Sequence, residues 1–199
     1  MDDTNETEKM PATSAEVELE TGRLRLRRWR SSDLQAFAQL NADPRVMEFF
    51  PRTLSEEESN ALAARIQQHF VDRGFGLWAV EIPGRTPFAG FIGLSTPRFE
   101  AHFTPCTEIG WRLAAAHWRQ GYATEGAKAV LDFAFRELRL EEVVSFTAKC
   151  NVRSVRVMER IGMTSSAAED FEHPLLPRGD RLSLHVLYRA KRCGALVHR

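Results

Sequence analysis

The sequence predicts an α/β fold, and one stretch in the middle of the chain carries most of that prediction. Residues 108–113 combine β-forming side chains with the alternation of a half-buried strand. Gly121 then marks a tight turn, because glycine accepts positive φ angles and close backbone approach. Beyond it, apolar residues recur at three- and four-residue steps up to Leu138, as on one face of a helix. We therefore expect a strand, a glycine turn and a long helix over residues 107–138.

The N-terminal region changes character near residue 20. The first 20 residues hold seven acidic side chains and one lysine, and we expect the polar residues 1–15 to be disordered. Residues 21–27 then alternate, with arginine and leucine taking turns from Arg23 to Arg27. This pattern predicts an edge strand whose arginines point outward.

Two helices are expected in the first third of the chain. Ser31 or Ser32 is a suitable N-cap for the first helix, which should end before Asp43-Pro44 because the residue before a proline disfavours helical geometry. The second helix begins at Ser55, where a Ser-x-x-Glu capping box satisfies free backbone N–H groups. Gly74 lies near its end.

The remaining elements follow the same kinds of pattern. Residues 77–82 and 88–95 are predicted to be strands, joined as a hairpin by a short turn containing proline and glycine. Residues 151–161 form a short amphipathic helix, and Gly162 is placed to end it. The other expected elements are strands at 142–149, 163–168 and 182–188, with loops over 96–105 and 169–181.

Length and composition favour one soluble domain. At 199 residues the chain is long enough for one sizeable core, and its 43% hydrophobic and 27% charged residues are ordinary for a globular protein. The formal net charge is zero, but the acidic N-terminus leaves the rest of the chain with an excess of six basic residues. A mildly basic body fits a polyanionic small ligand. Nucleic acid is not indicated, because no basic run with interleaved aromatic residues is present.

Cysteine, histidine and hydropathy patterns argue against a disulfide-stabilised, a metal-binding or a membrane protein. Cys106, Cys150 and Cys193 are odd in number and widely spaced, so we expect a reducing compartment rather than a disulfide framework. The six histidines show no HExxH or paired-ligand spacing, so no metal site is predicted. The N-terminus lacks an apolar signal region, and no run approaches the roughly 20 apolar residues that span a bilayer. We therefore expect a cytoplasmic protein without membrane association.

Two motifs resemble one protein family. The sequence EIGW followed by WRQGYATEG is similar to the acetyl-CoA pyrophosphate loop of the GCN5-related N-acetyltransferases (GNAT), specifically of their RimJ/RimL-like branch. In the family pattern Gln/Arg-x-x-Gly-x-Gly/Ala, Gly121 and Ala123 fit the last two fixed positions, whereas Trp118 stands where Gln or Arg is usual. The second motif, CNVRSVRVMERIGM over residues 150–163, follows in the family's order and spacing. The resemblance extends from about residue 20 to residue 192.

The resemblance implies a GNAT acyl-CoA N-acyltransferase fold, with a mixed central β-sheet flanked by helices on both faces. It implies a single domain over residues 16–192, followed by a short tail at 193–199, and acetyl-CoA as cosubstrate without a metal. A glycine turn before a helix suits this ligand, since free N–H groups and the positive end of the helix dipole attract phosphate. An ordinary strand-to-helix turn would show the same local pattern.

The resemblance also assigns cofactor-binding residues. Backbone groups of residues 110–113 would pair with the pantetheine arm and polarise the thioester carbonyl, where preorganised donors stabilise negative charge. Asn151 would hydrogen-bond the pantetheine arm, a role compatible with capping the helix that follows. Arg119, Arg153 and Arg156 could meet CoA phosphates or be solvated. The expected cofactor-binding residues are Trp111, Arg112, Leu113, Arg119, Gln120, Gly121, Tyr122, Ala123, Thr124, Asn151 and Ser154.

Ser154 is the candidate partner of the leaving thiolate. Many family members use a Tyr late in the second motif to protonate that thiolate, but the matching residue here is Met158, which has no proton to donate. The RimJ/RimL-like branch resembles this sequence in having Ser at the place of Ser154, so we expect Ser154 to hydrogen-bond the thiolate or the thioester sulfur. Tyr122 carries the other hydroxyl nearby and is expected to be mainly a packing residue.

Glu108 is the candidate general base. An amine must be neutral to attack a thioester, and a lysine starts from a pKa of about 10.4 and an α-amine from about 8. A carboxylate on a strand beside the cleft could accept that proton directly or through water. The alternative is a solvated or ion-paired strand residue. Other titratable residues that the sequence does not rank are Glu48, Glu100, His102, His117, Asp170, Glu172 and His173.

These residues together predict an N-acetyltransferase that moves the acetyl group of acetyl-CoA directly to a primary amine in a ternary complex. The acceptor is a protein N-terminus, as the RimJ/RimL resemblance suggests, or a small amine, with Phe49, Phe50 and residues 171–179 beside its groove by analogy. A catalytically silent acyl-CoA-binding module is the alternative that Met158 keeps open. A Rossmann protein is less supported, because no G-x-G-x-x-G follows an early strand. Oligomeric state is not readable, and a homodimer remains open.

Overall fold

The computed structural model describes residues 18–192, so the predicted tails at 1–15 and 193–199 lie outside the described residues. In the first half of the chain the elements are β1 (Leu19–Glu20), β2 (Arg25–Arg27), α1 (Leu34–Ala42), α2 (Glu56–Arg73), β3 (Leu77–Ile82), β4 (Thr86–Ser95) and β5 (Glu108–Leu113). In the second half they are α3 (Tyr122–Arg136), β6 (Glu142–Ala148), α4 (Val152–Arg160), β7 (Thr164–Ser165), β8 (Phe171–Glu172) and β9 (Leu184–Lys191).

The strands of residues 18–192 form one nine-stranded sheet. Its order is β1-β2-β3-β4-β5-β6-β9-β7, with β8 also paired to β9. Neighbouring strands run antiparallel except β5 and β6, which run parallel. This mixed sheet, together with the order of strands and helices along the chain, confirms the predicted fold class.

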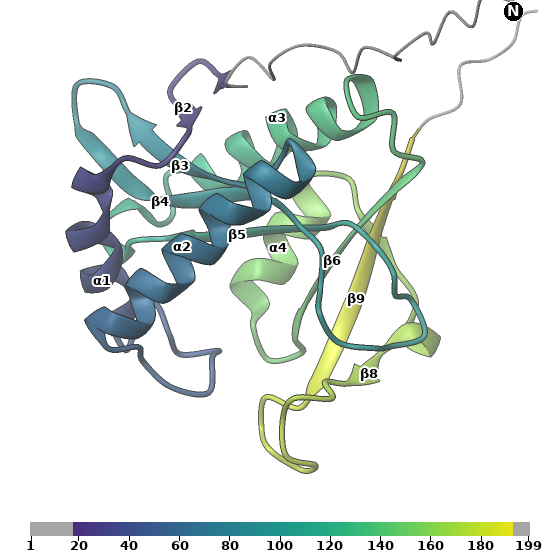
Figure 1. Ribbon diagram of the computed structural model, residues 1–199. Coiled ribbons are helices and arrows are strands. Elements are labelled where there is room, and N and C mark those ends of the chain that lie inside the picture. The colour runs from purple at the N-terminus through teal and green to yellow at the C-terminus, as the bar shows by residue number, and fades with distance from the viewer. Residues whose placement is uncertain (1–17, 193–199) are drawn as a thin grey trace, which may run out of the picture.

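Helices cover both faces of the sheet (Figure 1). Adjacent residues of a strand point to opposite faces, and Phe91 and Ile92 on β4 show this. Phe91 packs against Phe37 of α1, with ring centroids 6.1 Å apart. On the other face, Gly126 of α3 lies so close that a Cβ there would come within 2.5 Å of Ile92 Cδ1. α1 packs with α2 on the first face, and α4 packs beside α3.

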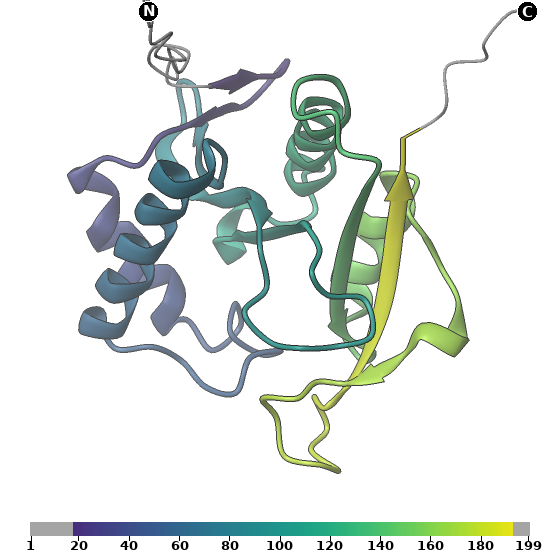
Figure 2. The same ribbon diagram turned by 45° about the vertical axis from the view of Figure 1, so that its right-hand side comes forward.

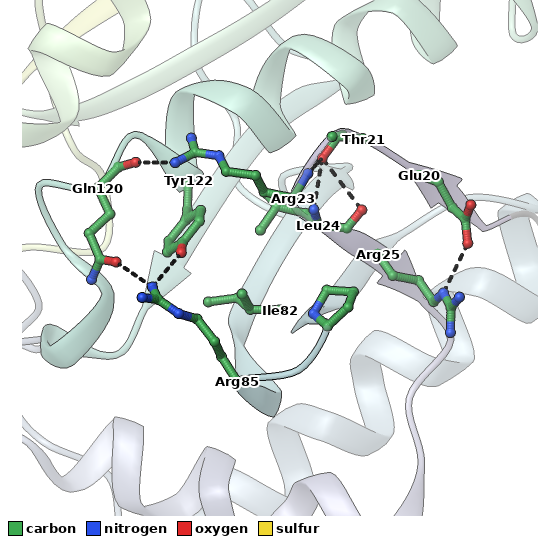
Figure 3. A pocket seen from close by; sticks show the side chains of 11 residues that line it. Glu20, Thr21, Arg23, Leu24, Arg25, Ile82, Arg85, Gln120 and Tyr122 are labelled. Carbon is green, nitrogen blue, oxygen red and sulfur yellow. Dashed lines mark hydrogen bonds and ion pairs between the residues drawn. The ribbon is translucent and has the colours of Figure 1, made fainter.

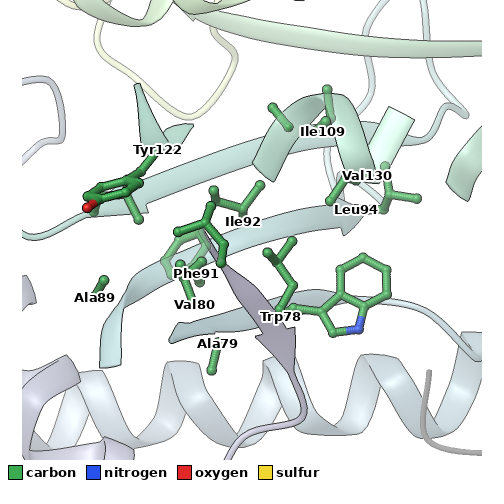
Figure 4. Packing of buried hydrophobic residues seen from close by; sticks show 14 of the residues in the cluster. Trp78, Ala79, Val80, Ala89, Phe91, Ile92, Leu94, Ile109, Tyr122 and Val130 are labelled. Carbon is green, nitrogen blue, oxygen red and sulfur yellow. The ribbon is translucent and has the colours of Figure 1, made fainter. Parts of the chain in front are cut away.

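The core between the sheet and α3 is a continuous apolar layer. Trp78 on β3 is fully buried and packs edge-on against Phe133 of α3, with ring centroids 5.4 Å apart. Ile92, Ile109 and Val130 are fully buried beside it (Figure 4). The predicted apolar face of α3 is therefore the face that covers the sheet. This packing sets the position of the start of α3 relative to β5.

β5 and β6 diverge after a single contact. Within residues 18–192 they pair at one position, Glu108 with Val144, where the Val144 N–H donates to the Thr107 carbonyl at 2.9 Å. β6 instead pairs with β9 over its whole length, from Glu142 to Ala148. Figure 2 shows β6 and β9 running away from the half of the sheet that contains β3 and β4. Residues 109–113 of β5 therefore have no strand neighbour on the β6 side.

The prediction that all arginines of the first strand point outward is wrong for Arg27. This side chain is fully buried, and its guanidinium forms two hydrogen bonds of 2.8 Å with the carboxylate of Asp33. Its Nε donates to Glu81 at 2.9 Å. A buried guanidinium is tolerated because these carboxylates compensate its charge. Arg23 and Arg25 remain partly exposed, as predicted.

Two predicted N-caps have different outcomes. Ser31 and Ser32 lie within a 3₁₀ turn that precedes α1, so neither caps that helix and this prediction is wrong. The Asp33 carboxylate instead accepts a hydrogen bond from the Arg30 backbone N–H at 2.8 Å, which fixes this turn. The Ser55 cap of α2 is confirmed, with its hydroxyl accepting from the backbone N–H three residues later.

The C-terminal elements also depart from the prediction in part. The strand expected over 163–168 is reduced to β7, because the chain enters a 3₁₀ turn at Ala167–Glu169, where Glu169 pairs with Arg189 of β9. β8 is a short strand inside the expected loop 169–181. The expected end of α4 is confirmed, since Gly162 follows it with a φ of +85°.

Candidate active site

A cleft of about 1230 Å³ opens where β5 and β6 diverge. β5, β6, α4 and the first turn of α3 line it, together with residues 45–51 between α1 and α2. Its charged side chains are mostly positive, because six arginines line it and Glu108 is the one lining carboxylate among the described residues. The arginines are Arg45, Arg112, Arg119, Arg153, Arg156 and Arg160. A cleft of this character attracts polyanionic ligands.

The turn before α3 forms one wall of the cleft. Arg119 and Gly121 both have left-handed backbone geometry, with φ of +59° and +83°. These two residues wind the chain into the helix, so that Ala123 and Thr124 of its first turn line the cleft. N–H groups of a first helical turn have no carbonyl partner within the helix, and the dipole adds positive potential there. This arrangement suits a phosphate group.

Gln120 is the expected cofactor-binding residue that does not line this cleft. Its side-chain oxygen accepts a hydrogen bond from Arg85 at 3.1 Å, and its backbone carbonyl accepts one from Arg23 at 2.9 Å (Figure 3). The Tyr122 hydroxyl also accepts from Arg85, at 3.0 Å. These contacts lie at a second hollow, of about 720 Å³, behind the turn. Gln120 and Tyr122 therefore brace the turn from its far side, and Tyr122 is buried as a packing residue.

The backbone of β5 lines the cleft along the free edge of the strand, whereas its side chains point to the two faces of the sheet. Trp111, Arg112 and Leu113 all line the cleft, as expected for the edge of a strand without a neighbour. Side chains alternate along a strand, so Trp111 and Leu113 share one face and Arg112 points to the other. The Arg112 Nη1 donates to the Asn41 side-chain oxygen at 2.6 Å, which places this guanidinium on the α1 side of the sheet.

Glu108 sits where β5 meets both of its neighbours. Its Oε2 accepts a hydrogen bond from the Ser95 hydroxyl on β4 at 3.3 Å. Burial raises the pKa of Glu108 to about 7, and the Ser95 hydrogen bond opposes that rise without cancelling it. A carboxyl group with a pKa near the working pH of a cell is well matched to general base catalysis.

Asn151 and Ser154 lie together at the start of α4 and both line the cleft. The Asn151 side-chain oxygen accepts from the Ser154 backbone N–H at 3.3 Å, which confirms Asn151 as the N-cap. Its amide nitrogen donates to the hydroxyls of Ser154, at 3.1 Å, and Thr147, at 2.9 Å. Since Ser154 accepts here, its hydroxyl hydrogen can be donated to a ligand. Met158 is fully buried, so its side chain faces the core instead.

The other titratable candidates divide into two groups. His117 and His173 line the cleft, and burial lowers the pKa of each imidazole. Glu48 pairs with Arg153 at 2.5 Å, and Asp170 pairs with Lys149 at 2.9 Å. The candidates that do not line the cleft are Glu48, Glu100, His102, Asp170 and Glu172.

The α4 arginines are partly engaged within the protein. Besides pairing with Glu48, Arg153 stacks over the rings of Phe49, at 5.2 Å, and Trp118, at 4.6 Å. Phe49 and Phe50 both line the cleft, as expected by analogy for an acceptor groove. Arg156 also lines it and is exposed.

His185 is a cleft residue that sequence reasoning missed. It lies on β9, and its ring centroid is 4.8 Å from that of His173, beside Phe146. Burial lowers the pKa of His185 as well. The alternation of β9 shows which of its residues share a face, but no local signal indicates that this end of the strand reaches the cleft.

The model of the acetyltransferase (GNAT) domain matches residues 23–164, which span both motifs of the cleft. The chain belongs to the GNAT family. Members of this family transfer acetyl groups from acetyl-CoA, and this GNAT chain is an acetyl-CoA-dependent N-acetyltransferase. The splayed β5 edge and the start of α3 fit that cosubstrate, because they offer backbone donors for its amides and phosphates.

Several known proteins are similar to this GNAT chain. It is 31% identical over 151 residues to the uncharacterized protein YkkB of Bacillus subtilis (strain 168), covering 75% of this chain and 87% of that protein. It is 32% identical over 157 residues to the FsC-acetyl coenzyme A-N(2)-transacetylase of Aspergillus fumigatus, covering 75% of this chain and 66% of that enzyme. A solved structure of RimL, the ribosomal L7/L12 alpha-N-protein acetyltransferase, in complex with coenzyme A shares the fold, with a TM-score of 0.69 at 19% identity over 88% of this chain and 98% of that one.

Two further properties concern residues 18–192. No three His, Cys, Asp or Glu side chains in this range come together as a group that could hold a metal ion. None of the helices in the same range combines the length and the apolar character needed to cross a bilayer.

Proposed function

We propose that this GNAT protein transfers the acetyl group directly to a primary amine, with Glu108 as general base. The observation that carries the proposal is the position of Glu108, which is the one carboxylate among the described cleft-lining residues and has a pKa raised to about 7 by burial. At neutral pH a substantial fraction of this carboxyl group is ionised. It can therefore accept the proton that an ammonium group must lose before it attacks the thioester.

On the donor side, the backbone of β5 and the start of α3 bind acetyl-CoA. The N–H groups on the free edge of β5 are fixed by the β4–β5 ladder, so they stabilise negative charge on the thioester oxygen without having to reorganise. The Ser154 hydroxyl donates a hydrogen bond to the sulfur as CoA leaves, while Asn151 holds that hydroxyl in place. Arg119 and Arg156, both exposed at the cleft, meet the phosphates.

Direct transfer is favoured over an acetyl-enzyme intermediate. Cysteine is one of the side chains that can hold an acyl group, and its thiolate is a strong nucleophile. Neither of the cysteines in residues 18–192, Cys106 and Cys150, lines the cleft. Burial also raises the pKa of the Cys106 thiol to about 11, which keeps it protonated and unreactive.

The acceptor is a primary amine, either a peptide N-terminus or a small molecule. The RimL name points to a protein α-amine for that protein, and the Aspergillus relative's name points to an N(2) nitrogen of another compound. Phe49, Phe50 and His173 line the same cleft as Glu108. The cleft has room for a flexible amine that reaches Glu108 along β5.

The test is thiol release measured alongside acetyl-CoA binding. Purified full-length protein is incubated with acetyl-CoA and a panel of peptides and small amines, free CoA is followed with a thiol reagent, and acetyl-CoA binding is measured by calorimetry. We expect binding together with amine-dependent thiol release on one acceptor class. Release that proceeds equally without any amine would contradict transfer to an amine.

A catalytically silent acyl-CoA-binding module is the second candidate, and one observation favours it. Met158 is fully buried at the place where many relatives have a proton-donating tyrosine. That candidate predicts tight acetyl-CoA binding with no thiol release across the whole panel, so the same experiment separates it from the proposed transferase.

A further inference from the structure

The Arg112 side chain carries a charge that no carboxylate of the described residues pairs with. It lines the cleft from β5, and it forms no ion pair with any carboxylate of residues 18–192. Its Nη1 donates to Asn41, but its Nε is buried and has no hydrogen-bond partner among the described residues. Burial lowers the pKa of Arg112 to about 10, so the guanidinium is still charged at neutral pH. Buried charges of this kind are costly unless an anion pairs with them.

The surroundings of Arg112 hold its guanidinium in a fixed plane. The guanidinium carbon lies 4.0 Å from the ring centroid of Phe50 and 5.4 Å from that of Phe91. The Asn41 bond to Nη1 leaves Nε and Nη2, the two nitrogens that form the side edge of the guanidinium fork. That edge can hold a carboxylate through two parallel hydrogen bonds. Phe50 is 37% exposed and Phe91 is buried, so Phe50 is the solvent-facing ring of this enclosure.

Arg112 and Glu108 lie on the same face of β5. They are four residues apart on a strand, which puts their side chains on one side and their α-carbons roughly 13 Å apart. Gly110 lies between them on that face, and a Cβ built there would meet Glu108 Oε1 at 3.9 Å and no other atom within 4 Å. The floor between base and guanidinium is therefore open. Glu108, a proton acceptor, and Arg112, a cation, flank this open stretch of β5.

We propose that Arg112 binds a carboxylate of the acceptor, so that the substrate is an amine whose acid group lies several bonds from its reactive nitrogen. This inference rests on the proposed transfer to an amine at Glu108 and names its substrate class. The separation along β5 disfavours acceptors that carry both groups on one carbon. It fits a lysine-like ε-amine with its α-carboxylate, or the two ends of a short peptide.

The test compares acids with their amides. A homologous series of ω-amino acids is assayed by CoA release beside the matching carboxamides and aminoalkyl phosphates. We expect kcat/KM to peak at one chain length and to be about 10- to 100-fold higher for the acid than for its amide, the range expected for a charge-assisted pair. In Arg112→Met that ratio should fall to near one, and in Arg112→Lys part of it should remain. Arg45→Met is the matched control, because Arg45 lines the same cleft but already pairs with Asp43 at 2.7 Å, and its ratio should stay high.

A measurement on the unaltered protein guards against a variant that fails to fold. An alkyl carboxylate without the amine, of the optimal length, should inhibit competitively against the acceptor and not against acetyl-CoA. Acid and amide reacting at equal rates in the unaltered protein would overturn the Arg112 inference while leaving the transferase intact. Phosphates preferred over acids would overturn the choice of carboxylate. No amine-dependent CoA release with any acceptor would instead overturn the proposed function.

Discussion

The hydroxyl of Ser95 donates to Oε2 of Glu108 at 3.3 Å, at the register position where β5 touches both β4 and β6. This contact favours the ionised carboxylate, whereas burial favours the neutral acid and has the larger effect. The balance puts the pKa of Glu108 at about 7. A strand residue thereby acquires the acid–base behaviour that amine acetylation needs.

Replacing Glu108 by Gln should remove the proposed base while preserving the shape of the side chain. We expect kcat/KM of the unaltered enzyme to rise with pH and level off above about 7, since the carboxyl must be ionised to accept a proton. Glu108→Gln should lose this acidic limb and lower kcat by about 10²- to 10⁴-fold. Glu100→Gln, at a carboxylate outside the cleft, is the control. If the Glu108→Gln variant kept the same acidic limb, that limb would belong to another group.

Removing the hydroxyl of Ser95 should shift the same limb. Without that hydrogen bond the ionised form of Glu108 loses support, so its pKa should rise further and the acidic limb of kcat/KM should move to higher pH. Ser95→Thr retains a hydroxyl and should restore most of the original profile. Identical pH profiles for Ser95→Ala and the unaltered enzyme would show that this contact does not tune the base.

Gly121→Asp should abolish acetyl-CoA binding. Gly121 has φ of +83°, and the new carboxylate would add negative charge at the start of α3, where phosphates are expected to bind. Gly74→Asp is the matched control, because Gly74 has φ of +76° at the end of α2 and lies outside the cleft. Calorimetry should show lost binding in the first variant and retained binding in the second. Equal affinities in both would sink the assignment of the turn.

Ser154→Ala should lower turnover more than it lowers acetyl-CoA affinity. The hydroxyl is proposed to act on the sulfur as CoA departs, so its contribution is largest in the transition state. Steady-state kinetics and calorimetry on the same preparation separate the two quantities. Ser166→Ala, at an exposed serine of the C-terminal region, should change neither. A fall in affinity alone would make Ser154 a binding residue only.

Arg27→Met should destabilise the fold strongly. The substitution leaves the buried Asp33 carboxylate without its guanidinium, and breaking a buried pair from one side costs about 3–5 kcal/mol. Denaturant unfolding of the variant and of the double variant Arg27→Met/Asp33→Leu should show that the second change recovers part of the loss. Arg45→Met, at an exposed pair, should cost less than about 1 kcal/mol.

Local patterns predict most of the elements in this fold because they report local physics. The periodicity of α3, the Ser55 capping box and the Asn151 cap each depend on residues within a few positions of one another. Arg27 departs from the expected outward orientation because its charge is compensated by Asp33 and Glu81, which belong to two other segments of the chain. Alternation along a strand cannot show whether its polar face meets solvent or carboxylates.

Some features of the candidate site can likewise be predicted from local sequence, and others depend on the tertiary structure. Glu108 and the turn at Gly121 are found from strand alternation, a glycine and family resemblance. The free edge of β5 has no side-chain signature. The family resemblance implies backbone donors at residues 110–113, and the divergence of β6 shows why that edge has no strand neighbour. The orientation of Arg112 depends on Asn41 in α1 and on Phe50 in the following segment, so it appears only once the tertiary structure is known.

The free edge of β5 also determines which substitutions the site can accept while it keeps its acetyl donor. A side-chain substitution cannot delete a backbone N–H, and proline is the one residue that lacks it. The contribution of β5 to the donor site is therefore inherited with the strand itself, whatever residues other than proline occupy positions 110–113. Of the side chains on the α1 face, Arg112 can be replaced without removing these N–H groups or the proposed base, so a substitution there would redirect the enzyme towards another amine while the acetyl donor stays the same.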